Sequence, residues 1–275
     1  MAGYSAVDIK KLRDETDAPI LEVKNALVDA NGDYERAKQI LRENGRAATA
    51  KRVDRVTSAG VVAFAVSDDK KKLGGVVLES ETDFVAKNES FIATAQKIAE
   101  MYLEQDPSGD PLAVSHGGKS VQEIIEEAVG RIRENIKVAK AVHLETDGEI
   151  EVYVHHDKSK GAAVVVEGKS GEHFRKVAIQ VVASPPLVLS KDHLSAEAIE
   201  KEIEIEISRA INEGKDEKLA RNIATGRVNK EFVKKAALFE QPFYMDPGLS
   251  VGQYITQSGS GSTVSEFVYL AVGVS

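Results

Sequence analysis

Two kinds of hydrophobic spacing alternate along this chain, one typical of helices and the other of strands. Within residues 5–45, apolar side chains recur every three or four positions in three short runs. Ser5 and Asp33 stand where they could cap the first and third of these helices. The pattern therefore predicts a small three-helix unit that ends at Gly45, followed by a polar linker over residues 46–55.

A strand, turn, strand and helix occur in that order twice in the middle of the chain. The six elements are expected at residues 60–66, 74–79, 91–99, 149–155, 162–166 and 174–183. This repetition predicts two related subdomains, each with helices on one face of an antiparallel sheet. Between them, apolar residues at helical spacing from Val121 to Ile136 predict one further helix.

The last third of the chain has a different pattern. Isoleucines recur at every fourth position from Ile199 to Ile211, and a polar break at 212–216 separates them from a second helical run. Residues 195–238 are thus predicted to form an antiparallel helical hairpin, and the pattern fits equally a hairpin on the core and one that protrudes. The prolines in residues 241–247 predict an extended segment, and residues 264–272 alternate like a final strand.

Together these patterns predict an α+β fold. We expect a helical module and linker at residues 1–54, a first core subdomain at 55–143 and a second at 144–275. The second subdomain would include the hairpin 195–238 and a C-terminal segment 239–275.

Composition narrows the functional classes. The chain has 275 residues, 42% of them hydrophobic, with no cysteine and a formal net charge of −8. This acidity argues against a general nucleic-acid-binding surface, and the lack of cysteine rules out disulfides and thiolate metal sites. No apolar run approaches the roughly 18 residues that span a bilayer, and residues 1–5 lack the features of a signal peptide. We expect a soluble, cytoplasmic protein.

Two stretches could carry chemistry of their own. Residues Ala113–Ser120 fit a relaxed phosphate-loop pattern, but no apolar strand precedes them, so a polar loop in which Ser120 caps a helix is favoured. His155 and His156 could bind a metal ion, but neighbouring residues of a strand face opposite sides. The sequence therefore predicts neither a cofactor nor a metal site, and no enzymatic activity.

The segment Thr82–Lys87 lies between a predicted strand and a predicted helix. Thr82 is placed to cap the helix start, which would put Asp83 and Phe84 at an exposed corner. Two interpretations follow. Phe84 could pack onto the sheet while Asp83 supports the cap, which is the commoner fate of a lone apolar residue, or the two side chains could enter a partner.

Five short motifs together resemble the bacterial elongation factor Ts family, in the same order as in that family. The motifs are Leu12–Thr16 with Lys24–Leu27, Asn31–Asp33, Thr82–Lys87, Tyr153–His155, and Gln241–Pro247 with Val251–Gln253. Each is short, but their joint order covers nearly the whole chain and makes the resemblance specific.

The resemblance implies that the chain binds elongation factor Tu and promotes release of its GDP. The N-terminal unit would be a module of the ubiquitin-associated type. The residues that match the family's contact positions are Thr82, Asp83, Phe84, Val85, Arg13, Ile20, Leu21 and His155. A transient ternary complex with GDP or GTP would form, and the pattern leaves open a homodimer of such complexes.

The chain departs from the family at some of these positions. Ile20 and Leu21 stand where some relatives carry Met, and Asp17 and Pro19 replace a glycine-rich turn. Two alternatives to the exchange hypothesis remain at this point. One is nucleotide binding by Ala113–Ser120, and the other is an adaptor that docks on proteins through its N-terminal helices.

Overall fold

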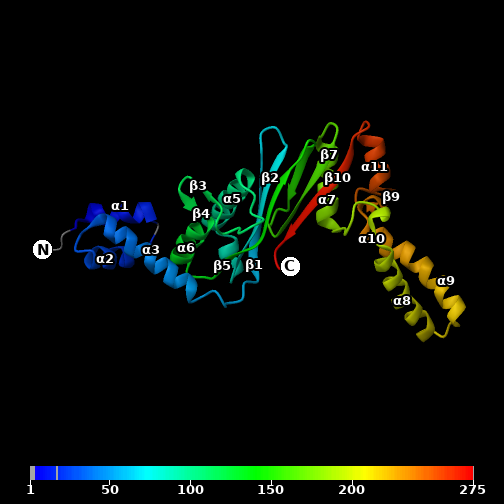
Figure 1. Ribbon diagram of the computed structural model, residues 1–275, viewed down its shortest axis with the longest axis horizontal. Coiled ribbons are helices and arrows are strands. Elements are labelled where there is room, and N and C mark those ends of the chain that lie inside the picture. Colours follow the sequence, from blue (N-terminus) through cyan, green and yellow to red (C-terminus); the bar gives the residue numbers. More distant parts are fainter. Residues whose placement is uncertain (1–3, 17, 275) are drawn as a thin grey trace.

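The structure is a computed structural model that describes residues 4–16 and 18–274, so Asp17 and residues 1–3 lie outside it. The molecule is elongated and has three parts (Figure 1). A helical module lies at the N-terminal end, a core with two sheets lies in the middle, and a helical hairpin projects at the far end. The predicted α+β fold class is confirmed.

The N-terminal module consists of α1 (Ala6–Thr16), α2 (Ile20–Asp29) and α3 (Tyr34–Ala50). Both predicted caps are present. The Ser5 hydroxyl accepts a hydrogen bond from the Asp8 amide at 3.2 Å, and the Asp33 carboxylate accepts one from the Arg36 amide at 2.9 Å. The module has a small apolar core of its own, made mainly of Leu12, Val23, Ala26, Leu27, Ala37 and Leu41.

The prediction that Gly45 ends the third helix is wrong, because α3 continues to Ala50. Gly45 is instead a close-packing position. A Cβ atom added there would lie 3.1 Å from the main-chain oxygen of Glu126. The linker that was expected from residue 46 therefore begins after the helix, and the added turn of α3 lies against the core.

The first sheet has the order β1 (Ala59–Val66), β2 (Lys72–Ser80) and β5 (Ile136–Glu145), all antiparallel. The helices α4 (Asp83–Ala86), α5 (Glu89–Glu104) and α6 (Val121–Ile132) follow β2. The large side chains Phe91, Ile98 and Tyr102 of α5 are fully buried and pack with Val76 and Leu78 of the sheet.

Two predictions in this region are corrected. The helix expected to reach Ile136 ends at Ile132, because Arg133 adopts a left-handed conformation with φ of 70°, and Ile136 begins a strand. Thr82 caps only the four-residue helix α4, and Asn88 caps the long helix α5 with a hydrogen bond of 2.8 Å from the Ser90 amide.

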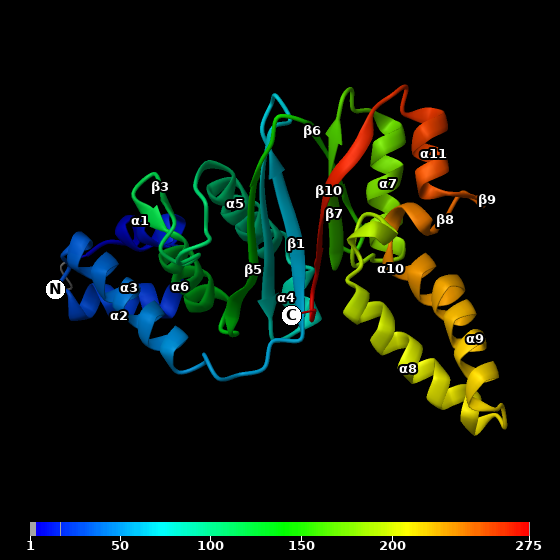
Figure 2. The same ribbon diagram turned by 45° about the vertical axis from the view of Figure 1, so that its right-hand side comes forward.

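The second sheet has the order β10 (Thr263–Ala271), β7 (Lys160–Glu167) and β6 (Glu149–Val154). Its outer face is covered by α7 (Glu172–Ala183) and α11 (Val251–Ser258) (Figure 2). The inner faces of the two sheets pack together through a shared apolar layer that includes Val62, Phe64, Val77, Ile150, Val165 and Leu270. Helix α11 was not among the predicted elements.

The predicted hairpin consists of α8 (Ala196–Asn212) and α9 (Glu217–Arg227), and it projects away from the sheets (Figure 1). Ile203 packs against Ala224 and Val228 between the two helices. The chain returns through a π-helical turn, Val228–Val233, into α10 (Lys234–Ala236). The segment expected to be extended then forms a small hairpin of β8 (Pro242–Phe243) and β9 (Asp246–Ser250).

Candidate functional site

Phe84 projects into solvent from the start of a very short helix. The Thr82 hydroxyl accepts a hydrogen bond from the Val85 amide at 3.5 Å, which starts α4 directly after β2. Val85 and Ala86 turn inward and pack against the apolar core of the first sheet. Phe84 faces the other way and is 83% exposed. The interpretation in which Phe84 packs onto the sheet is therefore wrong, and the exposed corner is confirmed.

Asp83 lies beside Phe84 on the same exposed corner. Its carboxylate forms an ion pair with the Lys87 ammonium at 2.6 Å, one helical turn further on. The hydrogen bond and the charge of Lys87 lower the pKa of the Asp83 carboxyl. Both side chains are well exposed, so Asp83 is a charged carboxylate that a partner can reach once Lys87 swings away.

The corner is held from behind by a residue that the sequence did not single out. Glu134 accepts two hydrogen bonds from Thr82, one from its amide at 3.0 Å and one from its hydroxyl at 2.6 Å. The Ser80 hydroxyl also donates to the Thr82 carbonyl at 3.1 Å. Glu134 and Thr82 are 52 positions apart in the sequence, so no local pattern could have indicated their contact.

The candidate contact residues of the N-terminal module are also exposed. Ile20 and Leu21, in the first turn of α2, are 46% and 69% exposed, and Arg13 lies exposed in the last turn of α1. Val23, Ala26 and Leu27 of the same helix are buried, whereas Ile20 is not. The module thus presents two branched apolar side chains on α2 and a cationic one on α1.

His155 lies in the turn after β6. Its Nδ1 atom is 3.0 Å from the Tyr153 hydroxyl, and its ring meets the His156 ring at a centroid distance of 4.4 Å. The Val62 amide donates to the Lys158 carbonyl at 2.7 Å, which ties this turn to the N-terminal half of β1. Since Ala59 of β1 pairs with Ser80, which precedes the corner, the turn and the corner lie toward the same end of the core.

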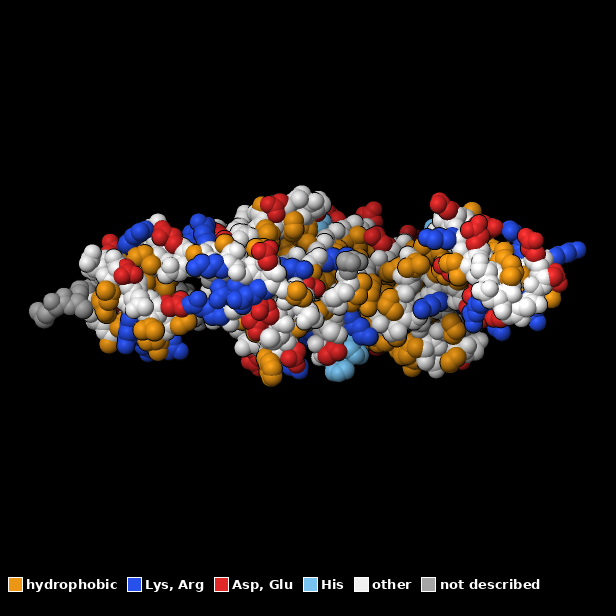
Figure 3. Space-filling model, turned by 90° about the horizontal axis from the view of Figure 1, so that it is seen from below, with side chains coloured by type: hydrophobic (Ala, Val, Ile, Leu, Met, Phe, Trp, Pro, Cys, Tyr) orange, Lys and Arg blue, Asp and Glu red, His pale blue; other side chains and the backbone are white. Residues whose placement is uncertain are grey.

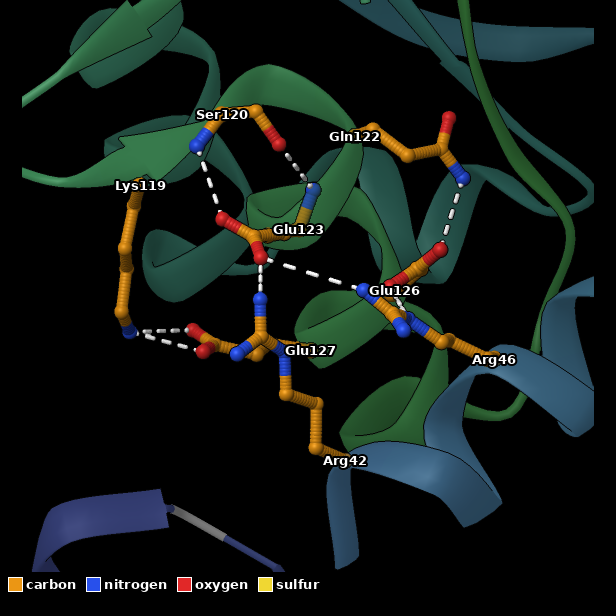
Figure 4. Close-up of polar contacts among 8 residues, drawn as sticks. All are labelled: Arg42, Arg46, Lys119, Ser120, Gln122, Glu123, Glu126 and Glu127. Atoms are coloured by element: carbon orange, nitrogen blue, oxygen red, sulfur yellow. Dashed lines mark hydrogen bonds and ion pairs between the residues drawn. The ribbon is translucent and has the colours of Figure 1, made fainter. Parts of the chain in front are cut away.

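The N-terminal module is joined to the core by charged side chains between α3 and α6 (Figure 4). Arg42 pairs with Glu123, and the Arg46 guanidinium donates to Glu126 at 3.0 Å. Figure 3 shows Lys and Arg side chains gathered where the module meets the core. The module, the corner and the His155 turn are therefore parts of one framework, although Arg13, Ile20 and Leu21 are not in contact with Phe84 through any described interaction.

Comparison with known proteins identifies the family. A model of the family described as Elongation factor TS matches residues 81–274. The chain belongs to the elongation factor Ts family. An Elongation factor Ts from Halothermothrix orenii is 38% identical over 268 residues, which cover 94% of this chain and 89% of the relative. Similar proteins of the same name from Acidithiobacillus ferrooxidans and Amoebophilus asiaticus are 39% and 36% identical, each over 98% of this chain.

The second candidate site, Ala113–Ser120, does not have the geometry of a phosphate loop. Residues 105–114, directly before the hairpin, contain no strand, and Gly117 and Gly118 form the turn between β3 (Ser115–His116) and β4 (Lys119–Ser120). Lys119 pairs with Glu127 at 2.7 Å, and the Ser120 hydroxyl caps α6. The stretch therefore lacks the phosphate-loop geometry on which the nucleotide-binding alternative depends, and the expected helix cap is confirmed.

Two further observations concern the part of the chain that the structure describes. No group of three or more His, Cys, Asp or Glu side chains is arranged there to hold a metal ion. His155 and His156 thus belong to no such group among residues 4–16 and 18–274. Within the same ranges, each helix is too short or too polar to cross a membrane.

Proposed function

We propose that this chain binds elongation factor Tu and promotes release of its GDP, so that GTP can bind in its place. Membership in the elongation factor Ts family supports this partner and this activity. The single observation that carries the proposal is the exposure of Phe84, which is 83% exposed although its neighbours Val85 and Ala86 pack inward. A partner that buried this large apolar side chain would gain about 1.5–3 kcal/mol from it.

In the proposed mechanism, Phe84 enters the nucleotide-binding domain of elongation factor Tu close to the magnesium site. Asp83 exchanges its Lys87 ion pair for polar groups of the partner and disturbs the water and hydrogen bonds that hold the ion. Because magnesium neutralises phosphate charge, its displacement weakens the hold on GDP. The chain makes and breaks no covalent bond in this scheme.

The size of the effect requires more than one contact. A thousandfold faster release corresponds to a barrier lower by about 4 kcal/mol, whereas burial of one Phe side chain contributes about 1.5–3 kcal/mol. The exposed residues Arg13, Ile20 and Leu21 of the module and His155 of the core would supply the remaining contacts. Since linkage is reciprocal, binding of GDP or GTP in turn weakens the complex, and the ternary complex is transient.

Stopped-flow release of a fluorescent GDP from elongation factor Tu tests the proposal. Wild-type chain should accelerate release, and Phe84→Ala should lower the stimulated rate by about ten- to one hundredfold, since the lost burial is worth about 1.5–3 kcal/mol. Asp83→Ala should also lower it. Leu187→Ala and Asp68→Ala, which change a Leu that is 69% exposed and an exposed Asp elsewhere, are the matched controls. Full stimulation by both the Phe84 and Asp83 variants would overturn the proposed entry of these side chains into elongation factor Tu.

The adaptor hypothesis remains testable beside it. An adaptor that works through its N-terminal helices requires residues 1–54 to carry most of the affinity for the partner. The exchange proposal places most of the affinity in the remainder of the chain. Titration of elongation factor Tu with the full chain, in variants Leu21→Ala and Phe84→Ala, separates the two, because the adaptor hypothesis expects the larger loss from Leu21→Ala.

A further inference from the structure

Three consecutive residues between α6 and β5 reach three different parts of the molecule. Arg133 pairs with Glu22 on α2 of the N-terminal module. Glu134 accepts both hydrogen bonds from Thr82 at the corner. Asn135 binds the linker that joins the module to the core. We refer to Arg133–Asn135 as the α6–β5 junction.

Asn135 is the buried anchor of the junction. It is 3% exposed, and its side-chain amide donates to the carbonyl oxygens of Arg55 at 2.7 Å and Val53 at 3.3 Å. Its main-chain amide donates to the Glu81 carboxylate at 2.6 Å, and Glu81 in turn pairs with Arg55 at 3.3 Å. The linker and the residue that precedes Thr82 are therefore fixed to the same point.

Arg133 connects the junction to the module. Its φ of 70° lies in the left-handed region that favours glycine, so the chain turns sharply there and the next residue points back toward the corner. The Arg133 carbonyl accepts a hydrogen bond from the Arg52 guanidinium at 3.0 Å. Its own guanidinium reaches Glu22, which directly follows the exposed Leu21.

The corner needs such outside support. Helix α4 has four residues, too few to be stable by its own hydrogen bonds. Its cap is the Thr82 hydroxyl, and the orientation of that hydroxyl is set by the 2.6 Å bond to Glu134. Without Glu134, the corner would keep its anchor through Val85 and Ala86 but would lose the contacts that orient its first turn.

We propose that Glu134 is a positioning residue for Asp83 and Phe84, and that the α6–β5 junction holds this corner at a fixed separation from the N-terminal module. The corner and the N-terminal module are then held in a fixed relative position before elongation factor Tu binds. This lowers the entropy cost of ordering them on binding. This inference rests on the proposed exchange function, and it adds an element of this chain that does not itself touch the partner.

The test replaces the carboxylate with its nearest isostere. The Thr82 amide and hydroxyl donate to different oxygens of Glu134. Glu134→Gln replaces one of these oxygens with an NH2 group, which donates, so one of the two hydrogen bonds is lost in this geometry. We expect faster hydrogen exchange at the amides of residues 82–87 and a stimulated GDP release about three- to tenfold slower, the range typical for one lost hydrogen bond. Glu145→Gln, which changes an exposed carboxylate paired with Lys72 at 2.8 Å, is the matched control.

A double-mutant cycle distinguishes positioning from a general loss of stability. If Glu134 acts through Phe84 and Asp83, then Glu134→Gln has a clearly smaller effect on release in a Phe84→Ala background than in the wild type. Additive effects of the two substitutions would overturn the inference, as would unchanged release by Glu134→Gln alone. If Phe84→Ala itself has no effect, the proposed function fails instead, so the two failures are distinguishable.

The other arm of the junction is tested from the module side. Glu22→Gln removes the partner of Arg133 without changing the left-handed residue. We expect the concentration for half-maximal stimulation to rise about two- to fivefold, in keeping with an exposed ion pair, while the maximal rate is retained. Glu43→Gln, whose carboxylate pairs with Arg36 within α3, is the control. An unchanged half-maximal concentration would show that the junction does not hold the module.

Discussion

Glu126 offers a direct test of how the N-terminal module is attached to the core. Its side chain is 10% exposed and accepts two hydrogen bonds, from Arg46 at 3.0 Å and from Gln122 at 2.9 Å. Glu126→Ala removes both. The Arg46 side chain is 54% exposed and keeps a second carboxylate, that of Glu123, at 3.9 Å. The loss therefore stays below the several kcal/mol of a broken buried pair. We expect the docking of α3 on α6 to weaken by about 1–2 kcal/mol.

That change corresponds to about a five- to thirtyfold increase in the undocked population of the module. Hydrogen exchange of the core-facing half of α3 and protease cleavage in residues 51–58 report this population. The main unfolding transition should move little, because the module and the two sheets each keep their own core. Added salt should increase hydrogen exchange and protease cleavage of the wild-type chain toward those of the variant, because salt partly screens the ion pairs.

Glu127→Ala is the matched control for this experiment. Glu127 follows Glu126 on the same helix, and its carboxylate pairs with Lys119 of the neighbouring hairpin rather than with α3. If both substitutions change exchange and cleavage equally, or if neither does, the ion pairs of α3 do not hold the module and the reasoning is wrong.

Two further outcomes are expected. Gly74→Ala should destabilise the fold by at least about 2 kcal/mol in urea unfolding, because its Cβ would lie 2.1 Å from the Ala99 carbonyl oxygen, whereas Gly109→Ala, with no atom within 4 Å, should be neutral. NMR titration of Asp83 should give a pKa below the ordinary Asp value, and Lys87→Ala should raise the pKa of Asp83. The ion pair stabilises α4 at pH values above the ordinary Asp pKa. This stabilisation is lost as the pH falls through the lowered pKa of Asp83. An unshifted Asp83 titration would contradict the pairing.

The elements that depend on local spacing could be predicted from the sequence. The three helices of the module follow from apolar positions and from short-range caps at Ser5 and Asp33. Strand β5 could not be found in this way, because Ile132 and Ile136 are four positions apart and continue the helical spacing of α6. The chain turns at Arg133, which is not a glycine, so the sequence gives no sign of the left-handed conformation.

Helix α11 could have been predicted. Ser250 and Gln253 form a capping box, with hydrogen bonds of 2.8 and 3.2 Å between each side chain and the other residue's amide, and this spacing is visible in the sequence. The prolines just before it indicate an extended segment instead. The division of the chain at residues 54 and 143 stays a prediction.

The exposed corner was predictable and its support was not. A cap residue between a strand and a helix places Phe84 at a turn, and the structure confirms its exposure. Glu134 holds that turn from 52 positions away, and such a contact depends on how α6 and β2 pack in space. The partner-binding roles of Asp83, Phe84 and His155 stay predictions until exchange is measured.

Strand β10 has a consequence for synthesis of this protein on the ribosome. It supplies one edge of the second sheet, and Leu270 lies in the layer between the sheets. Just beyond it, the Gly273 amide donates to the Glu79 carboxylate of β2 at 3.2 Å. The nascent chain therefore cannot complete the packing between its two sheets until residues 263–273 have emerged from the exit tunnel. A product that terminates before residue 263 would leave the β7 edge unpaired and open to aggregation.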